Sequence, residues 1–364
     1  MRRKQIATLL GASLTSLLLF GLFYAYHAQD ASSFLPQSLN ACVHLPAPLL
    51  RNESEPEIEK RAYATLLTTR ITDPDQEDLY FTAVRVLSYQ LLHQPETRTD
   101  LSIPFVVFVT PHVSAEKQAI LADEGATVVT LELLEPETNW VNPGEARFID
   151  QFTKLRLFEQ TQYEQILYLD ADMLLTRSLD AIWNEPEAQQ SSETLPAARS
   201  WSDLRLTGTS PPCTYSIVGV SDTGGSEHPF PPPTNLDMNG GFMLLRPSLH
   251  LFSYYVSILN TPHSFDSNLM EQALLNHAHR PDGRMPWKSF EPGRWNVNWP
   301  RLRDIEGGAA SLHDKFWEGT NEVWIERVLV EKWWRVQGRM EGFWVARRGD
   351  EGGEGGEDML EFKV

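Results

Sequence analysis

One short segment constrains the fold of this chain more than any other, an apolar run that ends in two carboxylates. Ile166-Leu167-Tyr168-Leu169 is continuously apolar, which favours a strand buried on both faces, and Asp170-Ala171-Asp172 follows it directly. A strand covered on both faces belongs to a sheet that lies between layers of helices. The segment therefore predicts an α/β protein with acidic side chains at the carboxyl edge of its central sheet.

The segments around this strand alternate between strand-like and helix-like patterns. Apolar residues recur at helical spacing from Tyr80 to Leu92 and from Phe152 to Tyr163, and a further helix is expected from Ser114 to Ala122. This alternation predicts a mostly parallel, Rossmann-like central sheet flanked by helices. The additional strands are expected at Tyr63 to Thr69, Ile103 to Val109 and Val128 to Leu134.

The N-terminal region predicts a membrane anchor followed by a stem. Residues 6–26 carry no charge and follow three basic residues, and about 20 apolar residues span a bilayer. We therefore expect a cytoplasmic tail at 1–5, a transmembrane helix at 6–26 and a stem at 27–60, with a cleaved signal peptide as the alternative. The sequon Asn52-Glu53-Ser54 is consistent with a lumenal stem.

The remaining residues predict one catalytic domain over residues 61–345. Within it, residues from about 185 to 233 are rich in Ser, Pro, Thr and Gly, which indicates surface insertions. Residues 346–364 form an acidic, glycine-rich tail that we expect to be disordered. Cys42 and Cys213 are too few for a disulfide framework or a cysteine zinc site, and whether they pair stays open.

The charge of the chain bears on its partners. The formal net charge of −18 argues against nucleic acid, because phosphate backbones are bound by clustered lysines and arginines. An acidic protein can still bind a diphosphate when a divalent cation lies between them. Asp170 and Asp172 suit that cation, because residues two apart on a strand project to the same side. Carboxylate ligands fit Mn²⁺ or Mg²⁺, which would offset charge on a departing nucleotide.

The chain resembles a known family at this point. Phe152-Thr153-Lys154-Leu155, with the strand and the Asp-x-Asp that follow, is similar to the Thr-Lys-Leu helix, strand and Asp-x-Asp of the glycogenin-like glycosyltransferase family 8. Further segments match in the same order, from about Tyr63 to Trp317. The resemblance implies a GT-A-like fold and a retaining, Mn²⁺-dependent transferase that uses a UDP-sugar, with Mg²⁺ as the other possible ion.

The resemblance also implies residues that bind the nucleotide sugar. Leu67-Thr68-Thr69 and Tyr80 match the strand and helix that hold the uracil and ribose in that family. Met238-Asn239-Gly240-Gly241-Phe242 matches its Asn-Ser/Ala-Gly segment, where glycine would allow the backbone to approach the sugar closely. The implied nucleotide-sugar-binding residues are Leu67, Thr68, Thr69, Tyr80, Lys154, Ala171, Asn239, Gly240 and Lys315.

The implied catalytic residues are Gln272, Asp266 and Glu271. Phe265-Asp266 and the segment from Glu271 to Asn276 resemble the family's Asp-Gln-x-x-Leu-Asn segment beside the anomeric carbon, with Glu271 in place of the usual Asp. The alternative for Glu271 is a solvated acid at a helix start. Because Gln272 is a poor nucleophile, we expect a front-side displacement in which Gln272 and Asp266 position the substrates and stabilise charge.

A late segment completes the resemblance. Residues 311–317, Ser-Leu-His-Asp-Lys-Phe-Trp, resemble the family's His-to-Lys-Pro-Trp segment, although the intervening Gly and the Pro are missing. His313 is then implied as a metal ligand beside Asp170 and Asp172, and Lys315 as a diphosphate contact. The segment from Trp295 to Trp299 resembles Asn-x-Asn segments of fungal-type members, and its rings would suit either sugar stacking or a core.

These expectations describe a single-pass type II protein of the Golgi or another secretory membrane, with a lumenal catalytic domain. Its partners would be a UDP-sugar donor that carries a hexose or an N-acetylhexosamine and a glycan or glycoconjugate acceptor. Two alternatives remain open. One is a catalytically silent lumenal carbohydrate-binding or scaffold protein of the same fold, and the other is a phosphoesterase that uses Asp170 and Asp172 around one cation.

Overall fold

The structure is a computed structural model that describes residues 61–73, 76–145, 148–196, 209–234, 237–321 and 325–351. All of them belong to one compact unit, residues 48–364. The predicted cytoplasmic tail, anchor and stem lie outside the described residues, as do Cys42 and residues 352–364. None of the helices in the described ranges is both long and apolar enough to cross a bilayer.

A seven-stranded central sheet organises the described residues, with the spatial order β10-β8-β9-β4-β1-β2-β3. β4, β1, β2 and β3 are parallel, as the alternating pattern predicted, and β10 is parallel to β8, a pair that the sequence analysis did not predict. β9 differs, because it runs antiparallel to both β4 and β8. The predicted α/β fold is therefore confirmed, with a mixed sheet. The strands are β1 (Arg61–Leu67), β2 (Phe105–Val109), β3 (Thr127–Thr130), β4 (Gln165–Leu169), β8 (Ile217–Ser221), β9 (Met238–Leu245) and β10 (Lys288–Ser289).

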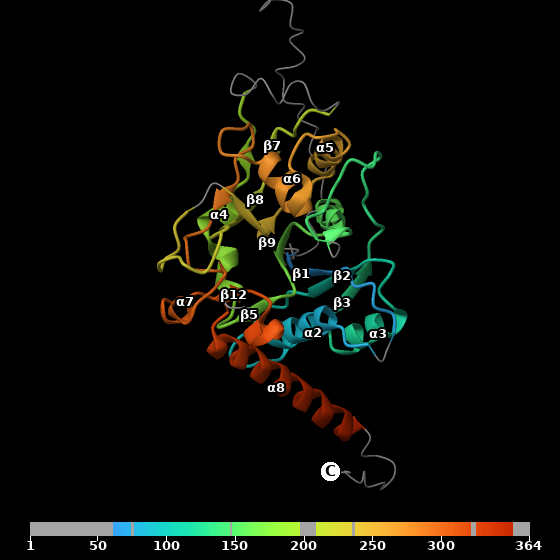
Figure 1. Cartoon of the computed structure of the whole chain (residues 1–364), viewed down its shortest axis with the longest axis vertical. Coiled ribbons are helices and arrows are strands. Elements are labelled where there is room, and N and C mark those ends of the chain that lie inside the picture. The colour runs from blue at the N-terminus through green and yellow to red at the C-terminus, as the bar shows by residue number, and fades with distance from the viewer. Residues whose placement is uncertain are drawn as a thin grey trace, which may run out of the picture. The chain divides into compact units, whose positions relative to one another are not determined.

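Helices cover both faces of this sheet, with α2 and α8 on one side and α5 and α6 on the other (Figure 1). Alternate residues of β4 therefore enter different cores: Leu167 and Leu169 pack with the first pair of helices, and Ile166 and Tyr168 with the second. Burial on both faces explains why β4 is apolar throughout. These helices are α2 (Leu79–Leu92), α5 (Leu249–Leu259), α6 (Met270–Ala278) and α8 (Arg327–Glu351).

The predicted helix at Ser114 follows its capping signal, whereas the one predicted from Phe152 differs from the expectation. Ser114, the predicted cap of α3 (Ala115–Asp123), accepts a hydrogen bond from the backbone N–H of Lys117. The segment expected as an amphipathic α-helix from Phe152 is instead a 3-10 helix, η3 (Gln151–Glu159). Nearly all of its side chains from Phe152 to Phe158 are buried, so packing on several sides determines its winding.

The region predicted as surface insertions contains a strand of the central sheet. β8 is a buried apolar run, and it lies inside the expected insertion from about 185 to 233. The Pro-, Ser- and Gly-rich segments on both sides hide this run in the composition of the sequence. The same region holds α4 (Pro186–Gln189), β6 (Ser192–Glu193) and β7 (Thr214–Tyr215), and η4 (Asp180–Asn184) lies directly before it.

A second, three-stranded sheet has the order β11-β12-β5. β12 (Ser311–His313) is antiparallel to β5 (Met173–Leu175), with His313 opposite Met173. β11 (Val297–Asn298) is parallel to β12, with Asn298 opposite His313. Because β5 follows Asp172 directly, this small sheet carries the late segment of the chain to the end of β4.

The C-terminal region is helical for longer than the sequence predicted. α8 begins at Arg327 and continues to Glu351, beyond residue 345, where the acidic tail was expected to begin. Trp333, Met340 and Trp344 recur on one face of α8 and are buried in the core shared with α2. Because these apolar residues continue to Trp344, α8 stays packed on the core up to the start of the Gly-rich segment. Short elements complete the described chain: η6 (Ser267–Leu269), α7 (Leu302–Glu306) and η7 (Phe316–Asn321).

Candidate active site

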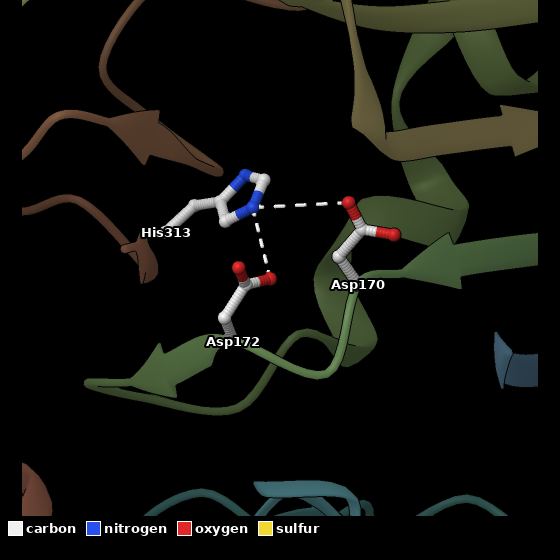
Figure 2. A group of neighbouring side chains, drawn as sticks. All are labelled: Asp170, Asp172 and His313. Carbon is white, nitrogen blue, oxygen red and sulfur yellow. Dashed lines mark ion pairs between the residues drawn. The ribbon is translucent and has the colours of Figure 1, made fainter. Parts of the chain in front are cut away.

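Asp170, Asp172 and His313 come together at the carboxyl end of β4. The Nε2 atom of His313 lies 3.0 Å from an oxygen of Asp172 and 3.8 Å from an oxygen of Asp170, and both carboxylates face the ring (Figure 2). One ligand atom from each residue lies within 4.8 Å of the others. The pairing of β5 with β12 produces this arrangement, because it places His313 beside the residue that follows Asp172.

The donor set of this triad fits a divalent cation. Two carboxylates and one imidazole are ligands that Mn²⁺ accepts. Burial raises the pKa of Asp172, but His313 and Lys315 outweigh it and hold that pKa below its ordinary value. Burial lowers the pKa of His313, but Asp172 outweighs it and raises that pKa. The carboxylates thus attract positive charge, which a bound cation would supply while leaving the imidazole neutral.

Lys154 and Tyr168 fix the orientation of Asp170. The buried ammonium of Lys154 lies 3.1 Å from Oδ1 of Asp170, and the hydroxyl of Tyr168 donates to the same oxygen at 2.6 Å. The other oxygen, Oδ2, is the one that faces His313. Such hydrogen bonds from outside the ligand shell orient metal ligands in proteins. Asp170 is therefore held with one oxygen directed toward the triad.

Glu271 is a buried partner of Lys154 rather than a solvated acid. Its carboxylate lies 2.7 Å from the Lys154 ammonium, which also donates to the carbonyl of Gly240 at 3.3 Å. Burial raises the pKa of Glu271 although Lys154 opposes the shift. Burial also opposes the charge on Lys154, yet Asp170 and Glu271 raise its pKa. The longer side chain at position 271 thus belongs to a buried chain of charges that reaches Asp170.

The glycines of the Asn239 segment lie against the triad. A side chain at Gly241 would collide with the His313 ring and would place its Cβ 2.6 Å from Oδ2 of Asp170. The backbone carbonyl of Gly241 also accepts a hydrogen bond from the backbone N–H of Asp170 at 2.8 Å. The sequence analysis expected glycine in this segment to let a sugar approach, which stays a prediction, and the structure shows that Gly241 leaves room for the side chains of Asp170 and His313.

Gln272 and Asn239 contact a carboxylate that sequence reasoning missed. The amide nitrogens of Gln272 and Asn239 donate to Oδ2 of Asp222 at 3.2 and 3.4 Å. The amide oxygen of Gln272 accepts from the backbone N–H of Gly240 at 2.7 Å. Asp222 follows β8 as Asp170 follows β4, so an acidic residue directly after a short apolar run was the signal that could have identified it.

The other predicted residues lie nearby or serve local structure. Ala171 is buried between the two aspartates, and the Lys315 ammonium lies 3.7 Å from Asp172. Asp266 is exposed and caps η6 through the backbone N–H of Asn268 at 3.1 Å. No direct contact joins Asp266 to the triad among the described residues.

The predicted nucleotide-binding residues of the first strand and helix lie at the end of β1 and at the start of α2. Leu67 ends β1, and the backbone N–H of Ile71 donates to the hydroxyl of Thr69 at 3.2 Å, which shapes the turn that contains Thr68. Tyr80 packs edge-on against Trp317, with ring centroids 5.2 Å apart. This contact joins α2 to the segment that follows His313.

In the segment from Trp295 to Trp299, the Trp295 ring belongs to the core. Trp295 is fully buried, with the guanidinium groups of Arg177 and Arg294 5.0 and 5.3 Å from its ring. Asn298 accepts hydrogen bonds from Thr223, the residue after Asp222. The segment therefore supports the loop that carries Asp222.

Comparisons with known proteins place this geometry in context. No protein family model matches the chain. The uncharacterised protein C5H10.12c of Schizosaccharomyces pombe is 30% identical over 308 residues, which cover 78% of this chain and 80% of that protein. Galactinol synthase 1 of Ajuga reptans is 25% identical over 253 residues, 64% of this chain and 71% of that protein. The solved glycosyltransferase GlyE of Streptococcus pneumoniae gives a TM-score of 0.47 at 15% identity, covering 79% of this chain and 64% of that chain.

Proposed function

We propose that the chain is a retaining UDP-sugar transferase of a family like glycosyltransferase family 8, and its similarity to galactinol synthases supports this proposal. It moves a hexose or an N-acetylhexosamine to a glycan or glycoconjugate acceptor. The observation that carries this proposal is the triad of Asp170, Asp172 and His313 at the carboxyl edge of the sheet. This edge is where α/β proteins bind their ligands.

Asp170, Asp172 and His313 are the proposed ligands of the cation. Mn²⁺ is the favoured ion because imidazole suits it better than it suits Mg²⁺. When bound, such an ion neutralises a diphosphate and stabilises the charge that develops on the leaving nucleotide. Lys315 brings a further positive charge to within 3.7 Å of Asp172, where it can contact the same diphosphate.

The proposed transfer is a front-side displacement. The bond between the anomeric carbon and the diphosphate oxygen breaks, and a bond to the acceptor oxygen forms on the same face. The acceptor proton passes to the departing diphosphate oxygen, which balances the step. Gln272 is held by Gly240 beside the triad and contributes orientation, because an amide is a poor nucleophile. Glu271 holds Lys154, and Asp266 caps the turn that leads into α6, so both act by positioning.

Residues 1–60 support a proposal about location. The uncharged segment 6–26 and its basic flank suit a single-pass type II anchor in a Golgi or other secretory membrane, with the catalytic domain in the lumen. Protease protection of sealed microsomes tests this topology. Digestion of the catalytic domain without detergent would contradict it.

A donor panel tests the activity. Purified full-length protein is incubated in detergent with UDP-glucose, UDP-galactose or UDP-N-acetylglucosamine, with Mn²⁺, with Mg²⁺ or with EDTA, and released UDP is measured. We expect release from at least one donor that requires the cation and disappears in Asp172→Asn. Asp237→Asn, a change at an exposed acid, is the matched control and retains activity.

The same panel separates the competing functions. A catalytically silent carbohydrate-binding protein would bind a UDP-sugar, measured by calorimetry, and release no UDP from any donor. A phosphoesterase would release inorganic phosphate from UDP in the absence of any sugar. Either result contradicts the proposed transfer.

A further inference from the structure

Asp222 lies at the end of β8 and is fixed through both its side chain and its backbone. Its Oδ2 atom accepts hydrogen bonds from the amides of Gln272 and Asn239, and its Oδ1 atom accepts from the backbone N–H of Gly224 at 2.9 Å. Its own backbone N–H donates to the carbonyl of Asp237 at 3.0 Å. The carboxylate is thus held in one place beside two residues of the proposed sugar site.

The side-chain amides of Gln272 and Asn239 donate to Asp222 through their nitrogens, and the oxygen of each accepts a hydrogen bond from a backbone N–H of β9. The oxygen of Gln272 accepts from the backbone N–H of Gly240 at 2.7 Å, and the oxygen of Asn239 accepts from that of Gly241 at 2.9 Å. A backbone N–H can only donate and a carboxylate can only accept. Each amide therefore has one orientation that satisfies both partners, with its oxygen toward β9 and its nitrogen toward Asp222.

The Gln272 contact is the more consequential of the two. An amide nitrogen carries two N–H bonds, and Asp222 binds one of them. Among the described residues, Asp222 is the single partner of the Gln272 amide nitrogen. Because the amide group is planar, this hydrogen bond also sets the direction of the second N–H. A hydrogen bond to an ionised acceptor is stronger than a neutral one, which suits it to holding a long, flexible side chain.

We propose that Asp222 is a positioning residue for sugar transfer, and that it acts through Gln272 by fixing the orientation of its amide. This inference rests on the proposed transferase function. It assigns Asp222 no contact with the donor or the acceptor. Without the carboxylate, Gln272 keeps its place on α6 but loses the fixed direction of its second N–H.

A double-mutant cycle tests the proposal. The substrate is the UDP-sugar that the wild type uses fastest, with water as acceptor, and the four proteins are the wild type, Asp222→Asn, Gln272→Ala and the double variant. Asp222→Asn replaces the charged acceptor with a neutral amide whose one oxygen cannot accept from both Gln272 and Gly224, so we expect kcat to fall about 10- to 100-fold in the wild-type background. The donor KM is unchanged, because other residues hold the nucleotide. In the Gln272→Ala background the same change lowers kcat by at most about threefold, because the intermediary is already absent.

Control variants keep the result interpretable. Asp237→Asn removes an exposed acid from the same loop but preserves the carbonyl that binds Asp222, so it retains wild-type kcat. If Asp222→Asn fails to fold in thermal unfolding, Asp222→Glu replaces it, because it retains the charge and displaces the oxygens. We expect the same loss of kcat at constant KM from that variant.

The outcomes distinguish a failure of the positioning role from a failure of the proposed function. Equal losses in the two backgrounds would show that Asp222 acts independently of Gln272 and would overturn the positioning role. Unchanged kcat in both Asp222→Asn and Asp222→Glu would overturn it as well. A wild type that turns over none of the donors would contradict the proposed function itself, and that result is read before any variant is compared.

Discussion

Asp170 follows β4 and Asp222 follows β8, and the two carboxylates have different kinds of partners. The charged cluster consists of Lys154, Asp170, Asp172, Glu271 and His313, in which acids meet ammonium and imidazole groups at 2.7 to 3.8 Å. The amide cluster consists of Asp222, Asn239 and Gln272, in which an acid receives directional N–H bonds. The first arrangement suits an ionic diphosphate and its cation, and the second suits the fixed orientation of two amide side chains.

This difference predicts unequal responses to substitution. Buried charges depend on one another, because removing one leaves its partners unpaired in a region of low polarity. Directional hydrogen bonds to amides are individually weaker, and their loss chiefly changes orientation. Changes in the charged cluster should therefore affect stability, cation binding and the turnover that depends on the cation, whereas changes in the amide cluster should affect kcat with little change in cation binding.

Lys154→Met should have the largest effect on stability. It removes the ammonium group that Glu271 and Asp170 share, and removing one partner of a buried ion pair costs about 3–5 kcal/mol. Chemical denaturation with urea measures the loss in free energy of unfolding. The double variant Lys154→Met/Glu271→Gln should recover part of that loss, because it removes the unpaired charge as well. A single variant as stable as the wild type would contradict the view that the charged cluster is mutually dependent.

Asp172→Asn should have the largest effect on turnover, with a smaller loss of stability than Lys154→Met, because the asparagine oxygen can still accept a hydrogen bond from His313. The substitution preserves shape but removes a charged ligand, and loss of one group that stabilises transition-state charge lowers kcat about 100- to 1,000-fold. Mn²⁺ affinity, measured by titration calorimetry on the protein alone, should fall in parallel. Normal Mn²⁺ binding by this variant would place the cation elsewhere.

The stability of the folded protein should depend on pH through His279, a buried histidine that belongs to neither cluster. His279, at the end of α6, is fully buried, and burial lowers its pKa to about 4. Its Nδ1 atom lies 2.6 Å from the carbonyl of Met285, and its Nε2 atom lies 2.5 Å from the hydroxyl of Tyr255. The folded protein thus keeps this imidazole neutral at a pH where the unfolded chain would protonate it.

The sign of the resulting pH effect follows from linkage. The folded pKa of His279 lies below the unfolded value, so its contribution is fully present above about pH 6.5 and is lost as the pH falls toward 4. The expected loss is at most about 3 kcal/mol. Urea unfolding at a series of pH values measures it, with His279→Gln as the comparison. If the free energy of unfolding of His279→Gln falls between pH 6.5 and 4 as steeply as that of the wild type, groups other than His279 cause the pH dependence.

The sequence predicted the charged cluster better than the amide cluster, for a physical reason. The carboxylates of Asp170 and Asp172 follow an obvious buried strand, and the family resemblance supplied His313 from far along the chain. Asp222 follows a strand of only five residues inside a Pro- and Gly-rich region, so composition concealed it. The small sheet that brings His313 to Asp172, and the buried pairing of Glu271, depend on long-range contacts that periodicity does not encode.

Tyr168→Phe should have the smallest effect and defines the boundary of the charged cluster. The hydroxyl of Tyr168 donates to Asp170 at 2.6 Å, yet Lys154 binds the same oxygen, so Asp170 retains one of its two orienting contacts. Loss of such an outer contact lowers metal affinity about 10-fold. The expected change is thus a weaker Mn²⁺ affinity with a free energy of unfolding close to that of the wild type, because phenylalanine fills the same buried space. Tyr163→Phe is the matched control on a half-buried tyrosine and should leave the affinity unchanged. An unchanged Mn²⁺ affinity in Tyr168→Phe would mean that Lys154 alone orients Asp170, and the charged cluster would then end at its ionic members.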